Sequence, residues 1–369
     1  MAALATALVP DHEVTIFSSS FEGLGDTDVR HRRVWALGSG FIWSVTFNLS
    51  SLLLLFLSHL KKEGGFDIIH AHAYDSTVLA ANVITSHFCE AEDLERLRRQ
   101  GSGVPPGERL ERQFKALLEK VLMRQSRRKS LIVLSERMKR EFLSHSLLLE
   151  ERLFVIPSGV DCTRYSPANI SLYRDEIRRR HSVTMTDTLV LFLGGYWERK
   201  GLCQAIKALS HLGSLEVTLL VVGRGDTVRF RELARHEDVE KRVIFAGPRP
   251  EPWKYYAASD IFLLPTLYEP FGLSVLEAMA TGLPVVVSRG AGVAELLQDG
   301  SDALLLEDPR DVAAISAKLE LLVENAELRR RLGERARQTA LGCTWARVAQ
   351  RTVDVYRQAR RDSEIAHAT

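Results

Sequence analysis

Two glutamates, eight residues apart, are the strongest chemical signal in the sequence. Glu269 precedes a Pro-Phe-Gly turn, and Glu277 lies in an apolar run that Gly282 and Pro284 end. This pattern predicts a helix, with one carboxylate just before its N-terminus and the other about a turn inside it. Carboxylates accept hydrogen bonds, so the pair suits the hydroxyl groups of a sugar.

The turn between the glutamates adds a second kind of site. Gly272, Leu273 and Ser274 would present free backbone N–H groups at the positive end of the helix, which favours an anion. A ligand with both phosphate and hydroxyl groups, such as a nucleotide sugar, fits this combination. An isolated glutamate pair would otherwise be interpreted as a turn residue and a solvated helix residue.

Two cationic residues lie earlier in the chain, shortly after an apolar run. Arg199 and Lys200 follow the apolar run 189–193 and the pair Gly194-Gly195. Fixed positive charge beside a strand end would offset the negative charge that develops on a leaving diphosphate. The alternative is that both are ordinary surface charges at the entry of a helix.

The segment Thr266–Thr281 resembles the E-x7-E signature of retaining glycosyltransferases of family 4, and the likeness continues through Pro284–Ser288 and Gly290–Glu295. The resemblance implies the α/β fold called GT-B, in which two Rossmann-like domains with doubly wound parallel sheets face a cleft. It also implies transfer of a hexose from a nucleotide-diphosphate sugar, expected to be a UDP-sugar, to a glycan or lipid-linked acceptor. Retention of configuration, no cofactor and no metal are expected from the family.

The resemblance also assigns roles on the donor side. Glu269 would contact the donor sugar and support the transition state, Glu277 would accept from the ribose, and Lys200 would bind the phosphates. The family places an arginine where this chain has Gly195. Arg199 would compensate, as in the similar Gly-x4-Arg-Lys-Gly turn of lipopolysaccharide-core glucosyltransferases.

Arg249 and His87 complete the expected site. Arg249 would border the nucleotide base, and His87 lies in a Thr-x-His context like that of the family's active-site histidine. The alternative for His70, His72 and His87 is that each is an ordinary hydrogen-bonded histidine. Only seventeen positions separate His70 from His87, which is short for a parallel crossover.

The predicted domains follow from alternating strand and helix patterns. Residues 1–160 and 161–344 are the two predicted domains. The family resemblance implies that the first is the acceptor side, that the second binds the donor, and that a last helix, about 345–369, crosses back onto the first. The expected strands are 13–18, 66–72, 82–87, 131–135, 154–156, 189–193, 215–222, 243–245, 260–264 and 285–288.

The first domain is expected to lack its first strand. Residues 1–8 have the character of the helix that should follow a strand and a Gly-rich turn. Either the protein continues before Met1, or the chain is a shortened, catalytically impaired nucleotide-binding or scaffold homologue. A dinucleotide oxidoreductase is disfavoured, because Gly223-Arg-Gly-Asp226 lacks a third glycine.

Composition and short motifs also bear on nucleic-acid binding, cellular compartment and metal binding. A formal charge of +2 gives no argument for nucleic acid, and four cysteines without paired spacing favour reduced thiols in a cytoplasmic protein. No signal peptide is expected. Asp26-Thr-Asp28 has the form of a metal-binding D-x-D but lies in a Gly-rich loop, where a solvated turn is expected.

Residues 34–60 contain no Asp, Glu, Lys or Arg. Arginines at positions 30, 32 and 33 precede them, and Lys61 and Lys62 follow. A buried or half-buried domain helix is the favoured interpretation, with peripheral contact to an anionic membrane and a spanning helix as alternatives. A basic face over 109–129 gives a second candidate surface for phospholipid or an anionic acceptor.

Overall fold

The computed structural model divides the chain into two compact units. Unit 1 comprises Met1–Pro157 and Trp345–Thr369, and unit 2 comprises Ser158–Thr344. The division falls beside Asp161, where the sequence placed a boundary. The structure describes residues 1–20, 27–38, 40–60, 65–72, 80–100, 112–113, 115–117, 119–120, 129–145, 150–213 and 216–368.

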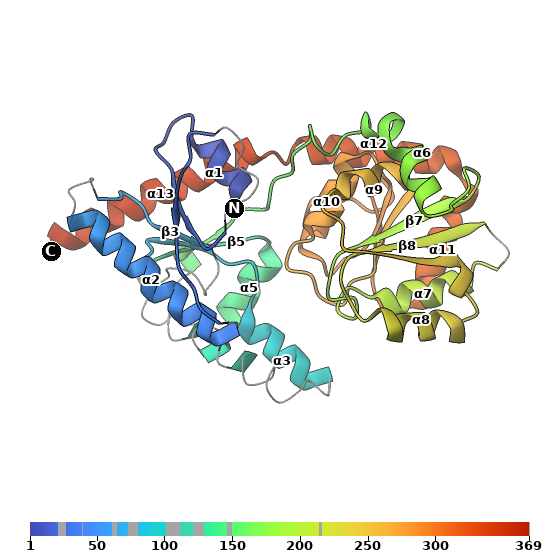
Figure 1. The fold of residues 1–369 in the computed structure, drawn as a ribbon, viewed down its shortest axis with the longest axis horizontal. Helices are drawn as coiled ribbons and strands as arrows, with labels where there is room; N and C mark the ends of the chain where they lie inside the picture. The colour runs from blue at the N-terminus through green and yellow to red at the C-terminus, as the bar shows by residue number, and fades with distance from the viewer. Residues whose placement is uncertain are drawn as a thin grey trace. The chain divides into compact units, whose positions relative to one another are not determined.

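Unit 2 is a parallel sheet covered by helices on both faces (Figure 1). Its strands, in spatial order, are β12 (Leu304–Leu306), β11 (Val285–Ser288), β10 (Ile261–Leu264), β7 (Thr188–Leu193), β8 (Val217–Val222) and β9 (Val243–Gly247). These strands are almost wholly buried apolar runs, as parallel strands between helices must be. The doubly wound sheet expected from the sequence is confirmed.

The helices of unit 2 form a layer on each side of that sheet. α7 (Leu202–Ser210) contacts α8 (Thr227–His236) and α11 (Val312–Glu324) on one face. On the other face, α10 (Leu273–Ala280) contacts α9 (Pro252–Ala258) and α12 (Ala326–Leu341), and α6 (Asn169–Arg180) packs on α9. Both layers leave the strand ends open for loops that bind ligands.

Unit 1 contains a second parallel sheet and a separate strand pair. The sheet order is β3 (His70–His72), β4 (Val83–Thr85), β5 (Ser130–Val133) and β6 (Leu153–Val155); the pair is β1 (Thr15–Ser18) and β2 (Arg30–Arg33). The strands expected over 66–72 and 82–87 are therefore shorter, and His87 lies in the loop beyond β4. Among the described residues, β1 follows helix α1 (Ala2–Leu8) and no ladder joins β2 to β3.

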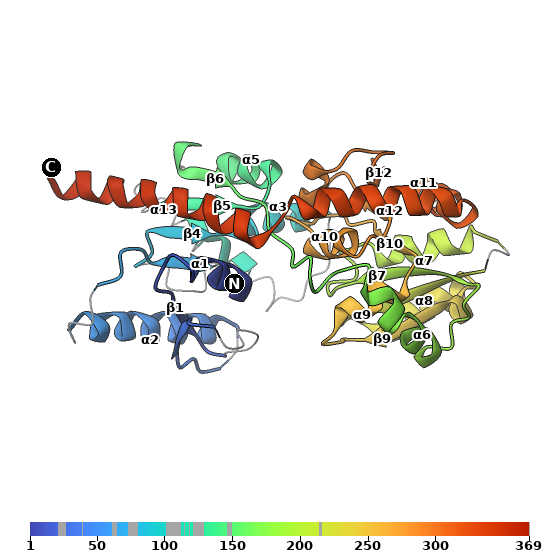
Figure 2. The same ribbon diagram turned by 90° about the horizontal axis from the view of Figure 1, so that it is seen from above.

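The last helix, α13 (Trp345–Ala368), belongs to unit 1. Val355 and Ala359 pack against Val83, Ile132 and Ile156 of the sheet. α1 lies against the same helix through apolar side chains. Figure 2 shows α13 on one side of unit 1 and α2 (Gly40–Leu60) on the other.

Unit 1 also contains helices α3 (Glu90–Gln100) and α5 (Glu136–His145). The helix expected over 109–128 is described only at 112–113, 115–117 and 119–120, where the residues are helical. Asp26 and three residues of the basic face, at 124, 127 and 128, lie outside the described residues. Within the described part of the chain, no helix has both the length and the apolar character that a bilayer span requires.

The contact between α12 and α10 gives the first prediction. A Cβ added at Gly333 would lie 2.1 Å from the carbonyl oxygen of Gly282, a backbone atom that cannot rotate away. Gly333→Ala should therefore lower the free energy of unfolding by roughly 1–3 kcal/mol, although alanine is the better helix former. Urea unfolding measures the change.

Gly65→Ala is the matched control, because a Cβ there meets nothing within 4 Å. We expect the stability of this control to change by less than about 0.5 kcal/mol. An unchanged midpoint for Gly333→Ala would contradict the close packing of α12 on α10.

Candidate active site

The centre of the unit 2 sheet is where its strand order reverses. β7 is the first strand of the unit in the chain, and it lies between β8 and β10. Loops that leave neighbouring strands at such a point diverge to opposite faces and leave a crevice for ligands. The loop after β7 carries Arg199 and Lys200, and the loop after β10 carries Glu269.

These three side chains meet in an ion cluster. Oε2 of Glu269 lies 3.2 Å from Nζ of Lys200 and 3.6 Å from Nη1 of Arg199, and none of the three side chains is more than 19% exposed. Two cations face one carboxylate, so the cluster keeps a net positive charge. Such a charge in a partly dry site favours an anion strongly.

Backbone hydrogen bonds hold the two loops together. The carbonyl of Arg199 accepts from the N–H of Leu267 at 2.8 Å and from the hydroxyl of Thr266 at 3.1 Å. The Arg199 guanidinium donates to the carbonyl of Tyr268 at 2.5 Å. The backbone carbonyl of Glu269 accepts from the N–H of Gly292 at 3.0 Å, so the backbone at Glu269 is also fixed.

Two glycines allow this close approach. Gly194 has φ +136°, and a Cβ there would lie 2.7 Å from Nζ of Lys200. Gly201 has φ +81°, and a Cβ there would lie 1.9 Å from the carbonyl oxygen of Pro265. Both conformations disfavour other residues. Gly194 makes room for the ammonium group, and Gly201 lets the β7 loop touch the end of β10.

Helix α10 starts beside the cluster. Gly272 precedes it with φ +106°, and Leu273 and Ser274 form its first turn, as the sequence predicted. The hydroxyl of Ser274 is buried without a hydrogen-bond partner, whereas the buried Oε2 of Glu269 already has the two cations as neighbours. Buried polar atoms are normally satisfied, so a ligand could bond to the Ser274 hydroxyl.

Glu277 lies one turn further along α10, and other side chains hold its carboxylate. Tyr256 donates its hydroxyl to Oε2 at 2.8 Å, and Tyr165 donates a second hydrogen bond. Burial raises the pKa of Glu277, which these bonds and the charges of Lys200 and Arg164 partly oppose. Lys200 therefore links Glu277 electrostatically to the ion cluster.

Tyr165 and Tyr256 were missed by the sequence interpretation. They lie far apart in the chain, and their rings meet edge to face at 5.7 Å. No spacing rule connects two such positions: Tyr165 lies just before α6, and Tyr256 lies within α9. Their role here is to fix the carboxylate of Glu277.

Gly195 and Arg249 lie outside these ion pairs. A Cβ at Gly195 would come no nearer than 3.6 Å to other atoms, so space does not require glycine there. Arg249 is exposed and donates from Nε to the carbonyl of Ala246 at 2.9 Å. Burial lowers the pKa of His181, and the charge of Arg249 lowers it further. No contact of the described residues brings Arg249 into the Glu269 cluster.

Three histidines gather in unit 1: His70 and His72 are the first and last residues of β3, and His87 follows β4. His70 lies between the hydroxyls of Tyr356 and Thr85, each 2.7 Å from a ring nitrogen. Burial lowers the pKa of His70 to about 3 and that of His72 well below its usual value. His72 stacks between His70 at 4.4 Å and the exposed His87 at 5.7 Å.

The loop that carries His87 is held by a buried acid. Oε2 of Glu119 accepts from the N–H groups of Glu90 at 2.7 Å and Ala91 at 3.3 Å, at the start of α3. The thiol of Cys89 donates to Oε1 at 3.8 Å. Burial raises the pKa of Glu119 to about 8. No motif or spacing in the sequence distinguishes Glu119 from the other charged residues around it.

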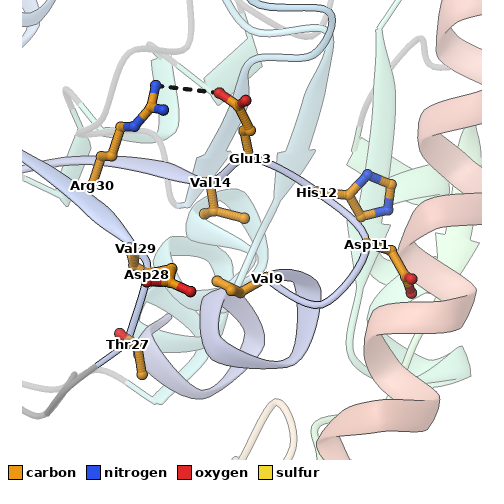
Figure 3. A pocket seen from close by; sticks show the side chains of 9 residues that line it. All are labelled: Val9, Asp11, His12, Glu13, Val14, Thr27, Asp28, Val29 and Arg30. Atoms are coloured by element: carbon orange, nitrogen blue, oxygen red, sulfur yellow. Dashed lines mark ion pairs between the residues drawn. The ribbon is translucent and has the colours of Figure 1, made fainter.

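The only part of the D-x-D motif that the structure describes is Thr27–Asp28. Asp28 is exposed and lines a shallow pocket of unit 1, shown in Figure 3. This pocket lies before β1 and β2, at the amino ends of the strands, whereas parallel sheets bind ligands at the carboxyl ends. Its carboxylates belong to Asp11, Glu13 and Asp28, and Glu13 pairs with Arg30 at 3.2 Å.

Among the described residues, one group has a spacing that could hold a metal ion. It consists of Glu92, Glu95 and His145, on α3 and α5. Nε2 of His145 already lies 2.7 Å from Glu92, so an ordinary hydrogen-bonded ion pair accounts for the arrangement. The group is in unit 1 and shares no residue with the expected site.

Comparisons with known proteins agree with the two-unit arrangement. A model of the group 1 glycosyl transferases matches residues 173–339, and a model of glycosyltransferase family 4 matches residues 1–164. A D-inositol 3-phosphate glycosyltransferase of Xylanimonas cellulosilytica is 30% identical over 318 residues, 81% of this chain and 73% of the relative. The chain belongs to glycosyltransferase family 4.

Solved structures give the fold of this family 4 chain as GT-B. The crystal structure of WaaG, a glycosyltransferase involved in lipopolysaccharide biosynthesis, has a TM-score of 0.79 at 23% identity and covers 96% of this chain and 94% of WaaG. Anabaena HepE in complex with UDP-glucose has a TM-score of 0.71 at 18% identity, over 100% and 95% of the two chains. Against the D-inositol 3-phosphate glycosyltransferases of Corynebacterium, the match spans only 51–59% of the relatives' length.

Glu119 gives a pH-dependent prediction. Its pKa of about 8 when folded exceeds the ordinary value of 4.5, so between these values the folded chain holds a proton that the unfolded chain has lost. The contribution of Glu119 to stability therefore falls as pH rises from about 4.5 to 8 and is level above that range. Glu119→Gln keeps an acceptor for the two N–H groups and should remove this decline.

The measurement is urea unfolding of both proteins across this pH range. The difference between them isolates Glu119 from the other titrating groups. Parallel pH profiles for wild type and Glu119→Gln would show that this carboxyl is not protonated in the folded state.

Proposed function

We propose that this chain is a retaining hexosyltransferase that moves a hexose from a nucleotide-diphosphate sugar, a UDP-sugar, to a glycan or lipid-linked acceptor. The observation that carries the proposal is the cluster of Glu269 with Lys200 and Arg199 beside the N-terminus of α10. It unites the positive charge of two cations on one carboxylate, the N–H groups of the helix start and the unbonded hydroxyl of Ser274 at the strand-order reversal.

The diphosphate is the part of the donor that this charge suits. Lys200 and Arg199 would bind it, together with the N–H groups of Gly272, Leu273 and Ser274. As the sugar leaves, charge accumulates on the phosphate oxygens, and preorganised cations stabilise that charge without having to reorient. Fixed cations here would do the work that a divalent ion does in other glycosyltransferases, so the proposal includes no metal or other cofactor.

The carboxylates suit the two sugars of the donor. Glu277 is set back from the phosphate position and held by tyrosines, so it would accept from the ribose hydroxyls. Glu269 would accept from the transferred hexose and support positive charge at the reacting carbon. Arg249 would border the base. Retention by front-face attack, with a donor phosphate oxygen taking the acceptor proton, follows from the family resemblance.

His87 would serve the acceptor side. It is exposed, it follows a strand of unit 1, and its buried neighbours His70 and His72 stay neutral at physiological pH. The names of the relatives support a UDP-sugar and a cell-envelope acceptor, because HepE was solved with UDP-glucose and WaaG is involved in lipopolysaccharide biosynthesis. We place the protein in the cytoplasm, with peripheral contact to the membrane.

Two substitutions test the assignment of roles. Glu269→Gln keeps the shape of the side chain and removes its charge, so transfer should fall by about 10²-fold or more while nucleotide binding is retained. Lys200→Ala should instead weaken binding of the nucleotide about tenfold or more, since a charge-assisted contact is lost. Calorimetry with UDP, GDP and ADP and turnover of their sugars measure both.

Glu240→Gln is the control, because Glu240 pairs with Arg235 just before β9, at the amino end of the sheet and so at the edge opposite the cluster. Wild-type activity in Glu269→Gln would overturn the assignment. Nucleotide binding by the wild type with neither transfer nor hydrolysis would favour the alternative, a nucleotide-binding or scaffold homologue.

A further inference from the structure

Helix α2 presents large apolar side chains to solvent. Ile42, Leu49, Leu53 and Phe56 are 58–63% exposed, and Val45 is 40% exposed. These positions recur at spacings of three and four residues, so they share one face of the helix. An apolar stripe of this size on a helix surface marks a contact with something outside the unit.

The opposite face of α2 is the buried one. It carries Phe47 and the small hydroxyl residues Ser51 and Ser58, and all three are at most 5% exposed. Ser51 and Ser58 donate to backbone carbonyls of α2 itself at 3.0 and 2.9 Å, so their burial leaves no unsatisfied hydroxyl. The expected half-buried helix is thus present, but the larger apolar side chains point away from the unit.

The apolar stripe continues into the preceding loop. The hydroxyl of Thr46 on α2 bonds to both the N–H and the carbonyl of Leu37, at 2.9 and 3.3 Å. This contact places Leu37, which is 69% exposed, beside the first turns of the helix. Trp35 is 70% exposed, and the guanidinium of Arg33 lies 5.1 Å from the centre of its ring.

Charge distinguishes which partner would cover this surface. No acidic residue occurs from 34 to 60, and basic residues flank the segment at both ends. Arg30 is partly neutralised by Glu13, whereas Arg33 is exposed beside Trp35. A protein partner would normally need a mixed polar rim, but an apolar stripe bordered by arginine and an indole matches the boundary between acyl chains and anionic headgroups.

We infer that α2 and the segment 33–37 form a docking surface for an anionic lipid bilayer. The helix lies parallel to the membrane, its outer stripe enters the acyl boundary by about 5–10 Å, and Arg33 and Trp35 lie at headgroup depth. The surface lies in unit 1 and specifies the peripheral membrane contact of the proposed function, so it rests on that part of the proposal and not on donor binding in unit 2.

Vesicle co-sedimentation of the full chain tests this inference. The probes are vesicles of phosphatidylcholine with and without phosphatidylglycerol. The triple variant Leu49→Ser, Leu53→Ser, Phe56→Ser should partition at least about 30-fold more weakly than wild type, because three large apolar side chains no longer enter the bilayer. Arg32→Gln with Arg33→Gln should weaken binding several-fold, only to vesicles that contain phosphatidylglycerol and only at low salt.

The matched control removes exposed apolar side chains elsewhere. Leu172, Val228 and Leu321 of unit 2 are 46–70% exposed, and their joint substitution by Ser should leave vesicle binding unchanged. Thermal unfolding checks that each variant is folded. Failure of the wild type to bind either vesicle overturns the inference, as does equal loss in the control. Light scattering that shows a dimer in wild type and a monomer in the triple variant would assign the surface to a second copy instead.

Discussion

Attraction between the carboxylate of Glu269 and the cations of Arg199 and Lys200 organises the loops at the centre of unit 2. Without Glu269, Arg199 and Lys200 would be adjacent like charges in a partly buried loop, and their repulsion would be poorly screened. With it, both cations are held close together and the cluster still has surplus positive charge. The same carboxylate thus assembles the loops and leaves them ready for an anion.

The sheet of unit 2 makes that arrangement rigid. β7 and β10 are neighbours, so the loops after them start side by side, and backbone bonds from Arg199 to Thr266 and Leu267 tie them together. Glycine at 194 and 201 lets the chains approach to distances that a Cβ would prevent. Because these restraints are backbone contacts, the charged side chains need little reorganisation when a ligand binds.

Most of unit 2 could be predicted from sequence because its signals are local, although β12 (Leu304–Leu306) was not expected. Its strands are continuous apolar runs, and the glutamate spacing places Glu277 within one helix. Contacts between distant residues could not be predicted: the tyrosines that hold Glu277, the stacking of His70 and His72, and the cap that Glu119 provides for α3. β2 was missed because an Arg-His-Arg-Arg run has the composition of a loop, yet an exposed strand tolerates it. The hydropathy of α2 predicted a helix, but not that its serines would face inward.

A crystal structure of the chain with a UDP-sugar would test whether the ion cluster and the start of α10 bind the donor. We expect the diphosphate within hydrogen-bond distance of Lys200, Arg199 and the first N–H groups of α10. The ribose hydroxyls should bond to Glu277 and the hexose to Glu269. A nucleotide bound elsewhere, with the pair between Glu269 and Lys200 unchanged and Ser274 still unbonded, would contradict it.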